Sequence, residues 1–381
     1  MYGGAMFKYR RFVTSAILIL CASTCTYALD YTSHQECRTC HSDIFKLWSS
    51  SLHARSYSNP SFQASFVKLL VDKGKQTGRL CLKCHAPLAH LTGNLEFESA
   101  PANEGVSCWY CHSVSSVNRD ADIDGYYNLD TSGVFYGPFP AVDPEDHPVI
   151  QSDLHLKAEL CAGCHQYTNV NGVDILETLS EWQQSSYSKN EVYCQNCHMP
   201  IMVDLSVVDG REVEGYYVTA HEFQGGHSRI NLKNAVTMVT EVTQQEQYLT
   251  VTVRITNAES GHKLPTGVPI RKLVLQVTLK NKANLKISTA RKVYRKALVD
   301  KYGTILESAS QMFLEATDIY SDNRINPQET RVEEFTFKLP RKVKQYKIET
   351  VLNYEYTRPL LADETVSVQM ATNKVSSRDV K

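Results

Sequence analysis

The chain has 381 residues and a formal net charge of −1. This length exceeds one domain of ordinary size and predicts two packed units with a targeting segment. The near-neutral charge provides no basic surface for nucleic acid and no acidic tail, so a nucleic-acid partner is excluded.

The N-terminus has the pattern of an export signal. Basic residues within 8–11 precede an apolar run, residues 12–22, and small residues before Leu29 suit cleavage after Ala28. The run is shorter than the roughly 20 residues of a spanning helix, which disfavours the alternative of an uncleaved anchor. Neither cysteine of this segment follows the small residue typical of lipidation. We therefore expect residues 1–28 to be a signal peptide and the mature protein to be periplasmic or otherwise extracytoplasmic.

The other ten cysteines form five CxxC pairs, and a histidine follows each pair. Two thiols at this spacing can each bond to one vinyl group of a haem while the adjoining imidazole binds the iron. Zinc knuckles and redox dithiols also use CxxC, but neither requires histidine after every pair. The pattern predicts five covalent haem c groups, with the motif histidines as iron ligands. The motifs are Cys37-Arg-Thr-Cys40-His41, Cys81-Leu-Lys-Cys84-His85, Cys108-Trp-Tyr-Cys111-His112, Cys161-Ala-Gly-Cys164-His165 and Cys194-Gln-Asn-Cys197-His198.

The sixth position of each iron decides whether a haem only transfers electrons or can bind a small molecule. Eight histidines lie outside the motifs, enough for a second imidazole at every iron. Met199 follows His198 directly, so it cannot easily reach the opposite face of the same haem. The distal ligands that we favour are His53, His90, His147, His221 and His227, with His34, His155 and His262 as alternatives. Which of them serves which iron is left open by the sequence.

Residues 29–230 contain all five motifs, so the haems themselves are expected to form the core of a mainly α domain with little regular structure. Helical spacing of apolar residues between Pro60 and Gly74 predicts one helix, and residues 47–54 predict another that ends near His53. Thr178 and Glu181 have the spacing of a capping box.

Residues 115–150 are rich in Gly, Pro, Asp and Tyr and predict a long loop. Asp120, Asp122 and Asp124 resemble the start of a calcium loop, but Thr131 stands where a bidentate glutamate is required. A solvated acidic turn is the favoured interpretation, with calcium as the alternative.

Residues 231–381 lack cysteine and show the alternation of half-buried strands at 248–256, 273–279, 332–339 and 346–356. This predicts an all-β sandwich domain of immunoglobulin-like kind. The loop 260–267 interrupts the pattern, and we expect it to contact the haem domain, either through His262 or as a plain turn.

Residues 34–230 resemble the cytochrome c-554-like multihaem family. The resemblance rests on the first motif followed by Trp48-Ser-Ser-Ser-Leu-His53-Ala54, on Glu104-Gly-Val-Ser-Cys108, on Glu181-Trp182 before the fifth motif, and on His221-Glu-Phe-Gln-Gly-Gly-His227. It implies a periplasmic electron carrier with mostly bis-histidine haems in close pairs. The fifth motif and the β domain depart from tetrahaem members and leave the redox partner open.

Electron transfer is the favoured function, with other cytochromes or a membrane quinol-oxidising complex as redox partners and peripheral membrane association as an open possibility. Alternatives are an oxidoreductase that acts on a small nitrogen or sulfur compound at one open haem, and a subunit of an extracellular electron conduit. No CxxCK motif marks an active-site haem, and no catalytic residue is assigned.

Overall fold

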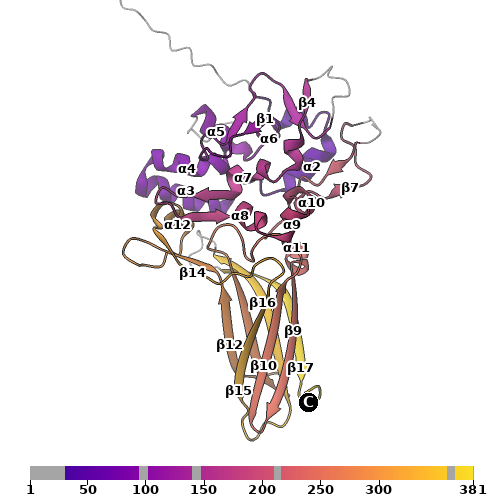
Figure 1. The fold of residues 1–381 in the computed structure, drawn as a ribbon, viewed down its shortest axis with the longest axis vertical. Coiled ribbons are helices and arrows are strands. Elements are labelled where there is room, and N and C mark those ends of the chain that lie inside the picture. The colour runs from indigo at the N-terminus through magenta and orange to yellow at the C-terminus, as the bar shows by residue number, and fades with distance from the viewer. Residues whose placement is uncertain (1–30, 94–101, 140–146, 210–215, 358–364, 381) are drawn as a thin grey trace, which may run out of the picture.

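The computed structural model describes residues 31–93, 102–139, 147–209, 216–357 and 365–380, so the expected signal peptide lies outside the described residues. Figure 1 shows a head of short helices on top of an elongated β domain. We call residues 31–234 the head and residues 236–376 the β domain. Within the described ranges no helix is long and apolar enough to cross a membrane.

Short helices carry the haem motifs of the head. In four of the five motifs the histidine is the last residue of a helix. In these motifs the second cysteine and the histidine follow the first cysteine by three and four residues, so all three side chains share one helix face. The helices are α1 His34–Cys37, α2 Ser42–Ser50, α3 Pro60–Lys73, α4 Lys75–His85, α5 Pro87–Thr92, α6 Cys108–His112, α7 Glu159–His165, α8 Thr178–Gln183, α9 Ser186–Lys189, α10 Cys194–His198 and α11 Arg229–Asn234.

Three local predictions can be compared with these helices. The helix after Pro60 is confirmed, because α3 begins at Pro60 with Asn59 as its N-cap and ends before Gly74. The predicted helix at 47–54 was placed too late, since α2 ends at Ser50 and His53 lies in the following turns. The predicted capping box is wrong because Thr178 is already the first helical residue and makes no cap.

The head also contains short strands, so it is less purely helical than expected. The predicted loop 115–150 contains two β pairings, one antiparallel between β1 and β2 and one parallel between β3 and β4. The strands of the head are β1 Val114–Val117, β2 Tyr127–Leu129, β3 Phe135–Gly137, β4 Val149–Gln151, β5 Gln166–Thr168, β6 Asp174–Glu177, β7 Ile201–Met202 and β8 Val218–Thr219.

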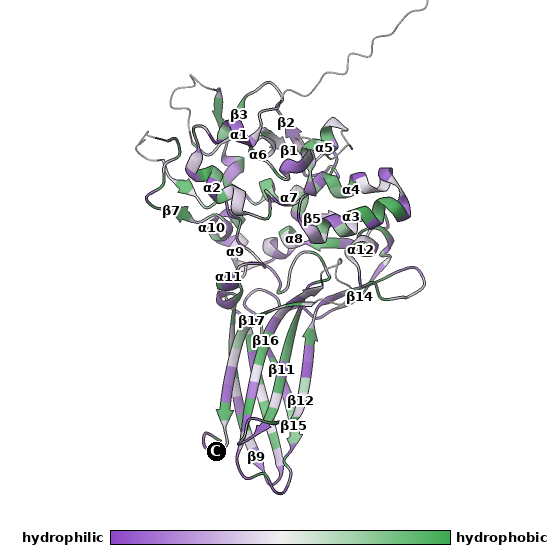
Figure 2. Ribbon diagram, turned by 180° about the vertical axis from the view of Figure 1, so that it is seen from behind, coloured by the Kyte–Doolittle hydropathy of each residue, from purple (hydrophilic) through white to green (hydrophobic). Residues whose placement is uncertain are grey.

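Two antiparallel sheets form the β domain, with strand orders β15-β10-β9 and β12-β11-β16-β17. Apolar and polar residues alternate along these strands (Figure 2), and the apolar faces of both sheets share one core that includes Val251, Leu275 and Ile348. The four predicted strands are confirmed. The strands are β9 Val236–Gln245, β10 Tyr248–Asn257, β11 Lys272–Asn281, β12 Lys286–Tyr294, β15 Thr330–Lys338, β16 Tyr346–Thr357 and β17 Thr365–Ser376.

One segment of the β domain packs on the head instead of joining either sheet. It comprises β13 Lys296–Val299, α12 Ala309–Glu315 and β14 Asp318–Asp322. Its Leu298 and Met312 share an apolar cluster with Ile175 of the head. The two parts of the molecule are therefore joined by a packed interface as well as by the chain at residues 234–236.

Candidate haem-binding site

The ten motif cysteines are all free thiols in the structure, which is the chemical form that thioether attachment requires. Thiols of different motifs lie close enough to shift one another's pKa. The thiol of Cys108 lowers the pKa of Cys37, that of Cys84 lowers the pKa of Cys164, and that of Cys161 lowers the pKa of Cys194. Because each thiol marks an edge of its haem-binding site, the first and third sites are neighbours, as are the second and fourth, and the fourth and fifth.

The third and fourth sites are also neighbours. Burial, and then the charge of the nearby Cys164 thiol, raise the pKa of Cys111 to about 12. All five sites thus form one connected group in which the fourth has the most neighbours.

Four of the motif histidines are oriented by a backbone carbonyl. A carbonyl can only accept a hydrogen bond, so Nδ1 of each ring carries the proton and Nε2 keeps the lone pair that a metal needs. This arrangement is typical of metal-binding histidine. The pairs are His41 with Val207 at 2.6 Å, His85 with Ser56 at 3.0 Å, His112 with Tyr136 at 2.7 Å and His198 with Gln224 at 2.5 Å.

Four motif histidines face a second imidazole. Two imidazoles that bind one metal ion from opposite sides, at metal–nitrogen distances of about 2.0 Å, have ring centres roughly 6 Å apart. Three pairs match this spacing and the fourth is somewhat closer. The ring centres lie 6.2 Å apart for His41 and His147, 6.2 Å for His165 and His53, 6.3 Å for His198 and His262, and 5.4 Å for His112 and His155.

Burial keeps the imidazoles of His53, His155 and His165 neutral, which is the form that binds iron. Burial and the neighbouring histidines lower the pKa of His53 to about 3, and burial with neighbouring positive charge lowers that of His165 to about 4. Burial next to His112 lowers the pKa of His155 to about 4.

His155 is a facing imidazole whose Nε2 is already hydrogen-bonded. Its Nε2 hydrogen-bonds the carbonyl oxygen of Cys111 at 3.1 Å, whereas its Nδ1 is buried without a hydrogen-bond partner. A buried nitrogen without a partner is costly. Iron bound at Nδ1 would satisfy it, so the ring suits a metal ligand in the less common orientation.

His85 of the second motif is the exception. The ring of Phe62 lies flat against it, with ring centres 4.0 Å apart and planes inclined by 11°. All thirteen histidines of the chain lie in the described part of the structure, and none of the others is in ring contact with His85 there. The second site thus offers one imidazole where the other four offer two.

Four of the histidines proposed as ligands face no motif histidine in the described structure. His34 pairs through Nδ1 with Glu104 at 3.1 Å, and His90 pairs through Nε2 with Asp124 at 3.3 Å. His221 is hydrogen-bonded to the carbonyl of Thr219, and His227 is exposed. Of the five favoured distal histidines, only His53 and His147 lie opposite a motif histidine. The other two facing imidazoles, His155 and His262, were among the alternatives.

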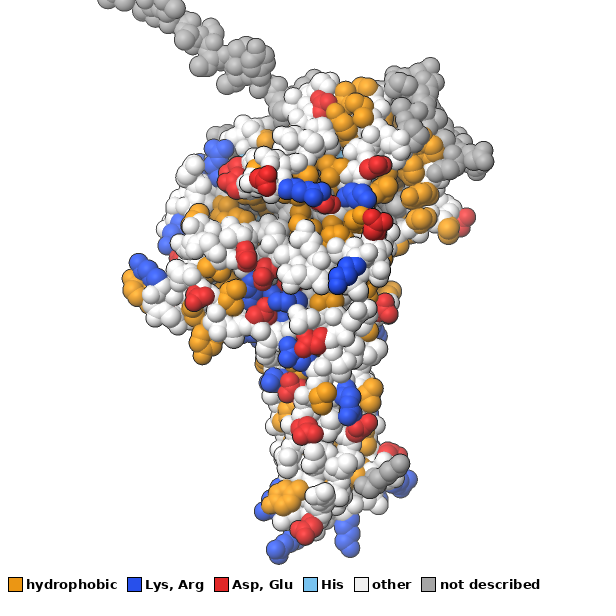
Figure 3. All heavy atoms as spheres, in the orientation of Figure 1, with side chains coloured by type: hydrophobic (Ala, Val, Ile, Leu, Met, Phe, Trp, Pro, Cys, Tyr) orange, Lys and Arg blue, Asp and Glu red, His pale blue; other side chains and the backbone are white. Residues whose placement is uncertain are grey.

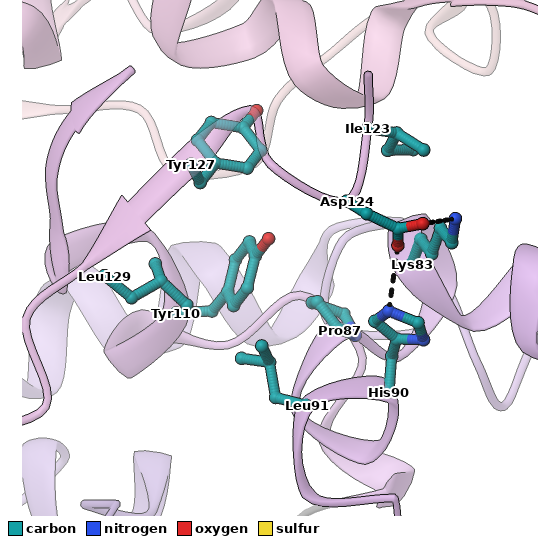
Figure 4. Close-up of a pocket in the computed structure, with 9 residues that line it drawn as sticks. All are labelled: Lys83, Pro87, His90, Leu91, Tyr110, Ile123, Asp124, Tyr127 and Leu129. Atoms are coloured by element: carbon teal, nitrogen blue, oxygen red, sulfur yellow. Dashed lines mark hydrogen bonds and ion pairs between the residues drawn. The ribbon is translucent and has the colours of Figure 1, made fainter. Parts of the chain in front are cut away.

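A small pocket of about 50 Å³ lies at the second motif (Figure 4). Lys83, the residue before Cys84, forms an ion pair with Asp124 at 2.5 Å, and the same carboxylate contacts His90. Tyr110 and Tyr127 line the opposite side (Figure 4). Asp124 is therefore committed to Lys83 and His90. Within the described residues no group of three or more His, Cys, Asp or Glu side chains is arranged to hold a metal ion such as calcium.

Each CxxCH motif has two free thiols and a histidine, and in four motifs a carbonyl orients the histidine so that Nε2 can bind iron. These features define a multihaem c-type cytochrome with covalently bound haem c. Comparison with known proteins agrees. Residues 36–113, which include the first three motifs, match the family model described as cytochrome c554 and c-prime. The chain is thus a multihaem cytochrome related to this family. No curated protein matches the chain.

The fold is that of a solved pentahaem cytochrome. The chain superimposes on the penta-heme cytochrome c552 from Thermochromatium tepidum with a TM-score of 0.73 and 23% sequence identity, covering 91% of this chain and 99% of the other. Other likenesses are partial. The putative ApaA protein from Bordetella pertussis (13% identity, 37% of this chain and 89% of the other) has a TM-score of 0.19, too low to carry an argument.

Proposed function

We propose that the protein is a pentahaem electron carrier. The observation that carries this proposal is that the thiols of neighbouring motifs lie close enough to shift one another's pKa, which joins all five CxxCH motifs into one group. Haem c, when bound, supplies an iron that changes between the ferric and ferrous states. The chain contributes the attachment thiols, the orienting carbonyls and the burial that excludes water.

The ligand scheme follows from the facing imidazoles. His41, His112 and His165 supply the proximal ligands of the first, third and fourth haems. Their distal ligands are His147, His155 and His53, at the ring separations given above. Two imidazole ligands close an iron to small molecules and favour outer-sphere electron transfer at low potential.

The cellular setting follows the same proposal. Covalent haem attachment and the expected signal peptide fit a periplasmic or other extracytoplasmic protein, and redox proteins are its expected partners. The β domain, with two facing antiparallel sheets, fits the immunoglobulin-like class, but this fold says nothing about chemistry by itself.

Electron transfer is tested on the mature wild-type protein. Its intact mass should exceed that of the polypeptide by five haem masses, and a spectroscopic redox titration should reduce and reoxidise all five haems reversibly. Fewer than five haems after full maturation, or haems that cannot be reduced reversibly, would contradict the proposal.

The second site favours one alternative function, an oxidoreductase for a small nitrogen or sulfur compound. His85 faces no second imidazole, and Lys83, Asp124 and His90 place a cation and exchangeable protons at this motif. An open iron next to proton donors is what reduction of a small molecule requires. Nitrite or hydroxylamine added to the reduced protein distinguishes the two functions, because a carrier is reoxidised slowly whereas an enzyme is reoxidised with saturation and turnover.

A further inference from the structure

The loop between β10 and β11, residues 258–271, extends from the β domain to the head. Where the loop passes α8 and α9, a side chain on Gly261 would have its Cβ 3.3 Å from atoms of both Trp182 and Tyr187. The hydroxyl of Tyr187 also donates a hydrogen bond to the carbonyl of Ala258. The absence of a side chain at residue 261 therefore allows the loop to lie directly on α8 and α9.

The next residue of this loop, His262, faces the last haem motif. Its ring centre is 6.3 Å from that of His198 and the two planes are inclined by only 15°. Nδ1 of His262 donates to the carbonyl of Lys263 at 3.0 Å, as Nδ1 of His198 donates to that of Gln224. Both rings thus keep Nε2 available for a metal, at the separation of two ligands of one ion.

A buried carboxylate of the head holds the loop in place on both sides of its turn. Glu181 of α8 accepts hydrogen bonds from the backbone N–H of Lys263 at 3.2 Å and from the hydroxyl of Thr266 at 2.6 Å. The backbones of Leu264 and Ile325 exchange two hydrogen bonds, and Asn257 donates to the carbonyl of His262 at 2.9 Å. The backbone that carries the imidazole is consequently fixed from both the head and the β domain.

Arg324 completes this connection. Its guanidinium is almost fully buried and pairs with Glu181 at 2.5 Å, Glu177 at 3.1 Å and Asp322 at 2.8 Å. Lys296 pairs with Glu177, and Lys263 with Asp322. Three carboxylates face three cations, so the network is neutral as a whole and can be buried between the two parts of the molecule.

We propose that the β domain supplies the sixth ligand of the fifth haem, through Nε2 of His262, and that Glu181 and Arg324 act as positioning residues for it. The proposal rests on the proposed function in one respect, since it requires haem attached at the fifth motif. It makes the β domain part of a redox centre: the coordination of this iron depends on the contact between head and β domain.

The test compares two single variants of the full-length holoprotein, His262→Ala and His227→Ala. His227 follows Gly226 near the fifth motif and was a favoured ligand from sequence, but it is exposed and faces no motif histidine in the described structure. We expect His262→Ala to add one high-spin haem per chain to the electron paramagnetic resonance spectrum and one binding site for carbon monoxide in the reduced protein. Added imidazole should restore the low-spin signal, and His227→Ala should match the wild type.

A high-spin signal that appears in His227→Ala instead, or a His262→Ala spectrum identical to that of the wild type, overturns the proposal. If His262→Ala does not accumulate, His262→Met decides. A thioether ligand raises the potential of a haem, so one of the midpoint potentials should rise while the iron stays low-spin, and unchanged potentials overturn the assignment. The haem count of the wild type, measured in parallel, reports separately on the proposed function.

Discussion

Phe62 lies flat on the imidazole of His85, with ring centres 4.0 Å apart, whereas each of the other four motif histidines faces a second imidazole. Coordination is thus expected to differ at one of the five haems. Phe62 is in the first turn of α3.

The first prediction concerns the oxidised wild-type protein. Because only the second site has a single imidazole, we expect one high-spin haem and four low-spin haems per chain by electron paramagnetic resonance, and carbon monoxide should bind one haem of the reduced protein. Carbon monoxide binding to no haem would mean that another side chain closes the second iron. Binding to three or more would contradict the paired imidazoles.

The second prediction concerns the distal ligands inside the head. Replacement of His147, His155 or His53 by alanine should each convert one low-spin haem to high-spin, because each faces one motif histidine. The matched control is His34→Ala, which removes an imidazole that pairs with Glu104 and should leave the haem spectrum unchanged. A control that opens a haem as readily as the three variants would invalidate the pairing.

The third prediction concerns the buried guanidinium of Arg324. Arg324→Leu should lower the free energy of unfolding by about 3–5 kcal/mol, since it leaves the carboxylate of Glu181 buried without its cation. Denaturant unfolding of the holoprotein measures the change. Arg295→Leu is the control, because its partner Glu307 is mostly exposed and such a pair contributes less than about 1 kcal/mol. If both variants lost the same free energy of unfolding, burial of the network would add nothing to the stability that its ion pairs provide.

The fourth prediction is a pH dependence set by Asp322. Burial raises its pKa, but hydrogen bonds and charge from Arg324 and Lys263 outweigh burial and hold the pKa well below its ordinary value. A carboxyl with a depressed folded-state pKa stabilises the fold fully above its unfolded value of about 3.9 and loses that contribution as the pH falls below it. The difference in unfolding free energy between wild type and Asp322→Asn should therefore be constant from about pH 7 to 5 and shrink below about pH 4.

Urea unfolding at a series of pH values measures this difference. Asp72→Asn is the control, because Asp72 pairs with Lys68 on the exposed face of α3 and its replacement should change stability little at any pH. A difference between wild type and Asp322→Asn that grows toward acid pH would refute the assignment of the charge network.

The fifth prediction concerns Gly163, between the two cysteines of the fourth motif. A Cβ at this position would lie 2.7 Å from the ring of Tyr126 and closer still to that of Tyr127, and hydrogen bonds to α7 carbonyls hold both rings. Gly163→Ala should destabilise the protein by about 1–3 kcal/mol through overpacking and lower the yield of chains with all five haems. Thr39→Ala, at the same position of the first motif but exposed, should mature normally, as intact mass will show.

Charged side chains of both signs gather on the surface where the head meets the β domain (Figure 3). The buried network around Arg324 continues this pattern into the interface. The sequence contains no signal for this network, because its members are far apart along the chain. Only the return of residues 296–325 to the head brings them together.

The sequence by itself determined the chemistry that depends on residues close together in the chain. Spacing of three and four residues places two thiols and an imidazole on one helix face, so the CxxCH motifs predict haem attachment directly. Alternation with a period of two predicted the strands of the β domain. The start of α3 at Pro60 was readable for the same reason, because a helix cap is a local structure.

Only the tertiary structure decided which imidazole lies opposite which motif. The partners are 106 residues apart in His41–His147, 112 in His53–His165 and 64 in His198–His262, and no local pattern encodes such distances. His155 and His262 resemble ordinary loop histidines in the sequence, and His90 and His221 looked equally suitable as ligands. The choice between them depends on how the chain folds around the haem sites, since a ligand is defined by the direction of one nitrogen toward one point in space.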